Sequence, residues 1–125
     1  MMAVGRWLDA HANGSAVALR YEDETISYRT LATLAAQFAS LLRDTHALTP
    51  GSRVAYLGHN TPEQLALVFA CARAGCALVP MNWRLTRSEL EDVVADAAPS
   101  LLVVDASCLD LLSAPMRAVC GERVY

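Results

Sequence analysis

Apolar residues are arranged along this chain in two different patterns. Short runs of consecutive apolar residues predict β-strands near residues 53–57, 77–80 and 101–104, because strands buried inside a parallel sheet are apolar on both faces. The strand at 77–79 is therefore expected to be covered on both faces. The longer stretches between these runs carry apolar residues three and four positions apart, which is the period of a helix with one buried face.

The clearest helical pattern precedes the first of these strands. Its apolar positions fall on one helical face and comprise Leu31, Leu34, Ala35, Phe38, Leu41 and Leu42. The helix is expected to end before residues 49–51, which have the composition of a turn. Upstream, Trp7, Leu8 and Ala12 indicate a short helix. Residues 16–21 and 25–27 predict two short strands around an acidic turn at 22–24.

Capping signals place a second helix after the first strand. Thr61, Pro62 and Gln64 open it, since an N-cap Thr accepts from a free backbone N–H and Pro fits the first helical position. The pattern continues to Ala74 and is apolar on most sides, so this helix should be deeply buried. Gly75 fits the left-handed position that closes a helix.

The remaining elements complete a strand–helix alternation. Thr86 and Glu89 have the spacing of a capping box and open a helix over 88–97, which Pro99 prevents from continuing. A weaker helical pattern covers 109–119, and a fourth strand begins near Arg123. Such alternation predicts a parallel sheet with right-handed crossovers.

We therefore predict an α/β fold. It consists of a partial doubly wound parallel sheet with flanking helices, preceded by a small antiparallel N-terminal element. A chain of 125 residues is one domain or part of one, and we expect no internal domain boundary within residues 1–125.

Composition excludes several classes of protein. Hydrophobic residues make up 54% of the chain and charged residues 18%, which argues against disorder. A net charge of −3 gives no basic footprint for nucleic acid or anionic lipid. The longest apolar run, Leu65–Ala72, is too short for a transmembrane segment, and the N-terminus lacks the apolar core of a signal peptide. We expect a cytoplasmic protein.

Cysteine and histidine spacing gives no support for a metal site. The cysteines are Cys71, Cys76, Cys108 and Cys120, and none forms a C-x-x-C pair. We interpret them as small buried hydrophobic residues. The three histidines lie far apart, and no H-x-x-x-H pair occurs. Only His59 follows a predicted parallel strand, where α/β ligand crevices form, but loop polarity explains it more simply.

Four segments together carry a family resemblance. Cys71–Leu90 resembles the pattern A-x-x-x-G-A-x-x-V-P-L-N-x-R-L-T-x-x-E-L of AMP-forming acyl-CoA synthetases. Ile26–Leu31 is similar to the T-Y-x-E-L element of that family, Pro50–Leu57 to its G-D-R-V-A-x-L element, and Leu101–Asp105 to the strand that follows. The order and spacing match over roughly residues 7–105. Ser52 replaces the usual Asp, and Arg29-Thr30 replaces the usual acidic position.

The resemblance implies a parent reaction. In this family a carboxylate attacks the α-phosphate of ATP, with Mg²⁺, to give an acyl-adenylate and pyrophosphate, and the thiol of CoA then takes the acyl group. The family stabilises the phosphate charge with a Ser/Thr/Gly-rich loop ending in lysine, an acidic metal-binding position and a lysine in a mobile C-terminal domain. This chain has neither the phosphate loop nor any lysine, since all ten basic residues are arginine.

We therefore expect the chain to be the N-terminal part of the large domain of such a synthetase. It should be inactive alone, with no catalytic or metal-binding residues of its own, and should not bind ATP, Mg²⁺ or CoA tightly without the rest of the enzyme. Its partner would be the remainder of the synthetase, in the same or a separate chain. The parent would act on a carboxylic acid and CoA, and the Asn82–Thr86 segment slightly favours fatty or aryl acids over amino acids.

The best candidates for ligand contact are Asn82, Trp83 and Arg84. They follow the strand 77–79 at its carboxyl end, the side where such sheets bind ligands. The resemblance implies that this loop faces the nucleotide end of CoA; a Trp can stack on adenine and an Arg can pair with a phosphate. In the structural alternative, Trp83 caps the sheet and Arg84 pairs with Glu89 or Glu91.

Two other functions remain open at this point. The chain could be a non-catalytic interaction module that pairs with another chain supplying the rest of the enzyme. It could also be a small α/β domain that binds CoA or a nucleotide without chemistry. Calorimetric titration with CoA and ATP distinguishes a binding domain from the other two.

Overall fold

The computed structural model describes the backbone of residues 4–124 and the side chains of residues 4–119. The chain divides into two compact units. The first runs to Pro50 and includes Asn60–Gly75; the second comprises Gly51–His59 and the segment from Cys76 onward. Among the described residues, no helix is both long and apolar enough to cross a membrane.

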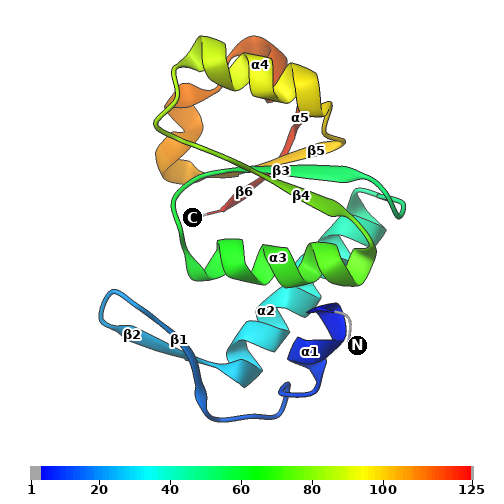
Figure 1. Cartoon of the computed structure of the whole chain (residues 1–125), viewed down its shortest axis with the longest axis vertical. Helices are drawn as coiled ribbons and strands as arrows, with labels where there is room; N and C mark the ends of the chain where they lie inside the picture. The colour runs from blue at the N-terminus through cyan, green and yellow to red at the C-terminus, as the bar shows by residue number, and fades with distance from the viewer. Residues whose placement is uncertain (1–3, 125) are drawn as a thin grey trace. The chain divides into compact units, whose positions relative to one another are not determined.

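The first unit combines a hairpin with three helices. In chain order its elements are α1 (Val4–Asp9), β1 (Val17–Tyr21), β2 (Glu24–Ser27), α2 (Tyr28–Ser40), a π-helical turn (Leu41–Thr45) and α3 (Pro62–Ala74). Strands β1 and β2 pair antiparallel, and Glu22 between them takes a left-handed conformation with φ of 52°. Figure 1 shows the hairpin leading directly into α2. The small antiparallel element and the long helix after it were both predicted.

Capping residues define the ends of the helices; those at Thr61 and Gly75 were predicted, and the one at Ser27 was not. The Ser27 hydroxyl accepts a hydrogen bond from the backbone N–H of Thr30 and starts α2. The Thr61 hydroxyl accepts from the N–H of Gln64 and starts α3. At the other end of α3, Gly75 has φ of 73°, the left-handed conformation that glycine adopts without steric cost.

The prediction that α3 is deeply buried was only partly correct. Its buried residues are Pro62, Ala66, Leu67, Ala70, Cys71 and Ala74. On another side of the helix, Leu65 and Val68 are each 37% exposed. Because apolar residues lie all around α3, its sequence alone does not distinguish the covered side from the open one.

The second unit is built on a four-stranded parallel sheet. Its elements are β3 (Arg53–Leu57), β4 (Ala77–Met81), α4 (Arg87–Ala97), β5 (Leu101–Asp105), a 3-10 helix (Ala106–Leu111), α5 (Ala114–Val119) and β6 (Cys120–Val124). The strand order is β4-β3-β5-β6, and every pair is parallel. In Figure 1, α4 and α5 lie on the same side of this sheet. The predicted α/β class and the parallel sheet are confirmed.

Strand β4 corrects a second prediction. It lies at the edge of the described sheet, and its first four residues, Ala77 to Pro80, are half-buried or exposed. It is therefore not covered on both faces. The apolar run predicted the strand but not its position, because strand order depends on pairings between distant segments. Pro80 fits an edge, since it has no N–H to donate to a neighbour on that side.

The end of the chain differs from the prediction in two details. The expected helix over 109–119 is divided into the 3-10 helix and α5, separated by Leu112 and Ser113. Pro115 explains the division, because proline is tolerated in the first turn of a helix but removes a hydrogen bond within one. The fourth strand begins at Cys120 rather than near Arg123.

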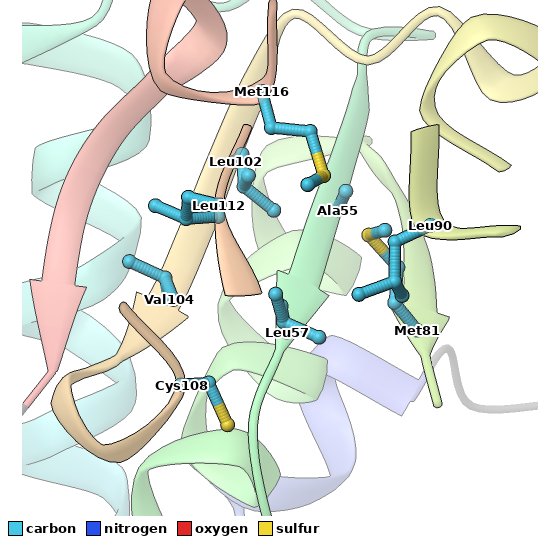
Figure 2. Packing of buried hydrophobic residues seen from close by; sticks show 9 residues of the cluster. All are labelled: Ala55, Leu57, Met81, Leu90, Leu102, Val104, Cys108, Leu112 and Met116. Carbon is cyan, nitrogen blue, oxygen red and sulfur yellow. The ribbon is translucent and has the colours of Figure 1, made fainter. Parts of the chain in front are cut away.

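Alternating residues of β3 and β5 build the core of the second unit. Ala55 and Leu57 on β3 and Leu102 and Val104 on β5 project toward the helices, as the two-residue period of a strand requires. They join a buried cluster with Met81, Leu90, Cys108, Leu112 and Met116, which Figure 2 shows together. The intervening residues Val54, Tyr56, Leu101 and Val103 are also buried. The central strands are therefore buried at nearly every position.

This packing predicts a difference between two leucines of one sheet. Leu102→Ala, in the buried cluster on β5, should lower the free energy of unfolding by about 2–5 kcal/mol, because it leaves a cavity. Leu78→Ala, on the half-buried edge strand β4, should cost about 1–2 kcal/mol, because the site is already partly solvated. Urea denaturation followed by circular dichroism measures both. Equal losses would contradict the edge position of β4.

The capping box of α4 gives a second stability prediction. The Thr86 hydroxyl accepts from the Glu89 N–H, and the Glu89 carboxylate accepts from the Thr86 N–H. Thr86→Ala should therefore destabilise the fold by about 1 kcal/mol, and Thr86→Ser should largely preserve it. Ser88→Ala removes a hydroxyl from the same exposed turn and serves as the control. A loss in the control as large as that of Thr86→Ala would show that the cap is not the cause.

Candidate functional site

The register of two parallel strands brings two loops together. Strand β3 pairs with β4 so that Leu57 lies opposite Met81 at the last position of each. Both strands run in the same direction, so the residues that follow them leave the sheet at the same edge. The loop after β3 begins with Gly58 and His59, and the loop after β4 contains Asn82–Arg84. These loops form the candidate site at the carboxyl edge of the sheet, where α/β proteins bind ligands.

Asn82 organises its own loop. Its side-chain oxygen accepts a hydrogen bond from the backbone N–H of Arg84 at 3.0 Å, which is the geometry of an Asx-turn. Its carbonyl oxygen accepts from the N–H of Leu85 at 3.1 Å. Asn82 therefore shapes the turn that presents the next two side chains, and its acceptor oxygen already has a partner within the loop.

Trp83 and Arg84 interact with each other on this turn. The guanidinium carbon of Arg84 lies 5.1 Å from the centre of the Trp83 ring, within the range of a cation–π contact. Trp83 remains 37% exposed. Among the described side chains, Arg84 forms no ion pair with Glu89 or Glu91, and the Glu89 carboxylate accepts from the Thr86 N–H.

His59 joins this surface from the neighbouring strand. Its ring centre lies 4.4 Å from that of Trp83, with an angle of 51° between the planes. Its carbonyl oxygen accepts a hydrogen bond of 3.0 Å from the hydroxyl of Tyr56, which is 1% exposed. Sequence reasoning treated His59 as an ordinary loop residue. The available signal was its position two residues beyond β3, level with Trp83 two residues beyond β4.

Gly58 permits the loop after β3 to lie close to the end of β5. A Cβ atom at this position would come within 2.6 Å of both the Asp105 Cβ and the Tyr56 hydroxyl oxygen. Asp105 in turn accepts hydrogen bonds from the backbone N–H and the hydroxyl of Ser107, at 3.0 and 3.1 Å. The ends of β3 and β5 are thus held against each other without space for a larger residue at 58.

Burial raises the pKa of two of the described cysteine thiols. Cys71 and Cys108 are buried, Cys76 is half-buried, and the side chain of Cys120 lies outside the described residues. Burial raises the pKa of the Cys108 thiol; the charge of Asp105 adds to this effect, and a hydrogen bond from Ser107 opposes it. Burial also raises the pKa of Cys76. Neutral thiols of this kind are poor nucleophiles and poor metal ligands at neutral pH.

The other groups considered from the sequence lie outside this surface. In the first unit, His11 lies against Trp7 and Tyr28, with ring centres 4.9 and 5.2 Å away. Across the residues that the structure describes, no group of three or more His, Cys, Asp or Glu side chains could hold a metal ion.

The arrangement of these side chains is suited to binding a ligand rather than to catalysing a reaction. A partly exposed indole offers a surface for a planar base, and an arginine next to it can form charge-assisted hydrogen bonds with a phosphate. The imidazole of His59 borders the same ring. Together these side chains offer groups that can stack on a base and pair with a phosphate.

This chain is similar in sequence to known CoA ligases and similar in fold to a solved one. The chain is 42% identical to an indoleacetate–CoA ligase of Aromatoleum aromaticum over 106 residues, which cover 83% of this chain and 21% of the relative. It is 39% identical to a feruloyl-CoA synthase of an Amycolatopsis species over 102 residues, covering 80% of this chain and 21% of that protein. It thus spans about one fifth of the length of these relatives.

A solved structure of similar fold is a benzoate CoA ligase from Burkholderia xenovorans. The TM-score is 0.87 at 16% identity, with 100% of this chain and 26% of that chain covered; this identity supports the fold alone. The sequence profile described as "AMP-binding enzyme" matches residues 7–123. A match over nearly the whole chain shows that this protein belongs to the AMP-binding enzyme family.

Proposed function

We propose that residues 1–125 form the N-terminal part of the large domain of an AMP-forming acyl-CoA synthetase and contribute a surface for the nucleotide end of CoA. The observation that carries this proposal is the Trp83–Arg84 contact on the loop after β4, at the carboxyl edge of the parallel sheet. Family membership and the two CoA-ligase relatives support it.

The complete enzyme would join a carboxylic acid to CoA. The acid and ATP give an acyl-adenylate and pyrophosphate, and the CoA thiol then displaces AMP to give the acyl-CoA. ATP does not fit the residues of this chain, because its basic residues are ten arginines without a lysine and it contains no glycine-rich phosphate loop. The chain alone therefore does not catalyse adenylation, and the remainder of the synthetase supplies those groups.

The nucleotide end of CoA fits the candidate site. Its adenine would stack on Trp83, and its phosphates would accept hydrogen bonds from Arg84. In the structure the guanidinium of Arg84 lies over the Trp83 ring. A base that stacks there would displace Arg84 from the indole and turn it toward the phosphates. Asn82 contributes by holding the turn that carries both side chains.

The relatives favour an aromatic acid as the second substrate of the complete enzyme. One is an indoleacetate–CoA ligase and the other a feruloyl-CoA synthase, and both names denote carboxylic acids with an aromatic ring. The sequence of the Asn82–Thr86 loop pointed to fatty or aryl acids. A cytoplasmic location stays a prediction from the sequence.

A specific observation favours an interaction role alongside this one. Leu65 and Val68 lie three positions apart on α3, and each is 37% exposed. The chain also spans only about one fifth of its relatives. An exposed apolar surface of this kind suits contact with a protein partner. We assign the role of that partner to the remainder of the synthetase, in the same or a separate chain.

Calorimetric titration of the purified chain with CoA tests the binding proposal. We expect weak binding that Arg84→Ala reduces about tenfold, because a charge-assisted hydrogen bond to phosphate is lost. Arg53→Ala is the matched control: it removes the same charge at the amino end of β3, where the Arg53 guanidinium donates to the carbonyl of Ala97. The same titration with ATP shows whether the surface distinguishes CoA from another adenine nucleotide.

The outcomes separate the candidate functions. Heat with CoA that depends on Arg84 supports the CoA-facing surface. Silence with CoA in the wild-type chain would contradict a site that works without the remainder of the enzyme. Equal weakening by Arg84→Ala and Arg53→Ala would indicate a general charge effect and would contradict the assigned role of Arg84.

The exposed side of α3 gives a separate prediction. The double variant Leu65→Gln/Val68→Gln should bind less of a hydrophobic fluorescent dye than the wild-type chain, because two neighbouring apolar side chains are removed from its surface. Val17→Gln, at an exposed position on β1, is the control and should change dye binding much less. Unchanged dye binding in the double variant would remove the support for a docking surface on α3.

A further inference from the structure

His59 is the part of the candidate site that the proposed CoA contacts leave without a role. It follows β3, whereas the predicted ligand-binding residues all follow β4. The in-register pairing of Leu57 with Met81 places the two loops side by side. His59 and Trp83 are therefore brought together by the sheet, although 24 positions of sequence separate them.

Two contacts restrain the backbone at His59. The buried hydroxyl of Tyr56 donates to the His59 carbonyl oxygen at 3.0 Å. The preceding residue, Gly58, lies so close to Asp105 and Tyr56 that no Cβ fits there. These contacts fix the point from which the imidazole projects, so His59 is a more rigid neighbour for Trp83 than an ordinary loop residue would be.

The ring of Trp83 contacts two side chains that restrict it. The imidazole of His59 lies 4.4 Å away between ring centres, tilted by 51°, and the Arg84 guanidinium lies 5.1 Å from the ring centre. A partly exposed indole on a loop would otherwise sample several rotamers, and ordering it on binding would cost affinity. Arg84 leaves the ring when it turns to a phosphate, so His59 is the contact that remains.

We propose that His59 is a positioning residue, which holds the Trp83 indole in the orientation that accepts the base of CoA. This inference rests on the proposed CoA-binding function for its consequence in affinity. The positioning itself concerns only the two rings. It depends on the flat aromatic shape of the His59 side chain, so phenylalanine at this position should replace it and alanine should not.

The experiment uses the full chain in a Trp7→Phe background, which leaves Trp83 as the only tryptophan. Time-resolved fluorescence anisotropy of Trp83 reports the nanosecond motion of its ring. We expect His59→Ala to increase this motion and to weaken CoA binding about fivefold through lost preorganisation. His59→Phe should restore both. His11→Ala is the matched control, because that histidine lies against the aromatic side chain at position 7 and Tyr28, away from Trp83.

Each result decides the proposal. Increased motion in the alanine variant with rescue by phenylalanine, at an unchanged melting temperature, supports it. Unchanged motion and affinity in His59→Ala overturn it, as does a phenylalanine variant that behaves like alanine. If the chain with only the Trp7→Phe substitution binds no CoA, the proposed CoA-binding function is contradicted, independently of the role of His59. The anisotropy of the two His59 variants then still confirms or refutes the positioning of Trp83.

Discussion

The pairing of β3 with strands on both of its sides is the constraint on which the second unit depends. Val54 to Leu57 lie in register with β4 on one side and β5 on the other. This register decides which residues of three distant segments meet at the carboxyl edge of the sheet. It also directs Ala55 and Leu57 into the same buried cluster as residues of α4 and α5. A shift of this pairing register by one residue would move every side chain of β3 to the opposite face of the sheet.

The same register determines the chemistry available at that edge. It brings an imidazole, an indole and a guanidinium into one row, from His59 through Trp83 to Arg84. These groups can stack on a base and pair with a phosphate. Stabilising charge at a reacting phosphorus requires cations together with backbone N–H groups directed at the phosphates, whereas this row contributes one guanidinium, that of Arg84. These side chains are the basis of the binding role proposed for this surface.

Most of the local structure could be predicted because its causes are local. The Thr86–Glu89 box, the Gly75 stop and the strand at 53–57 depend on residues a few positions apart, and each was found where expected. The prediction of one helix over 109–119 was wrong, because it did not treat Pro115 as a residue that interrupts a helix. Asn82, Trp83 and Arg84 could be named as candidates because they share one loop and one family pattern, and their role as ligand contacts stays a prediction.

The sequence by itself determined the α/β class, most of the strand and helix positions and the family, because periodicity, capping residues and family motifs are local features of the chain. Only the tertiary structure decided that β4 is an edge strand, that one side of α3 stays open, and that His59 lies against Trp83. Those facts depend on strand order, on burial and on the register between β3 and β4. All three arise from contacts between distant segments, which no local pattern specifies.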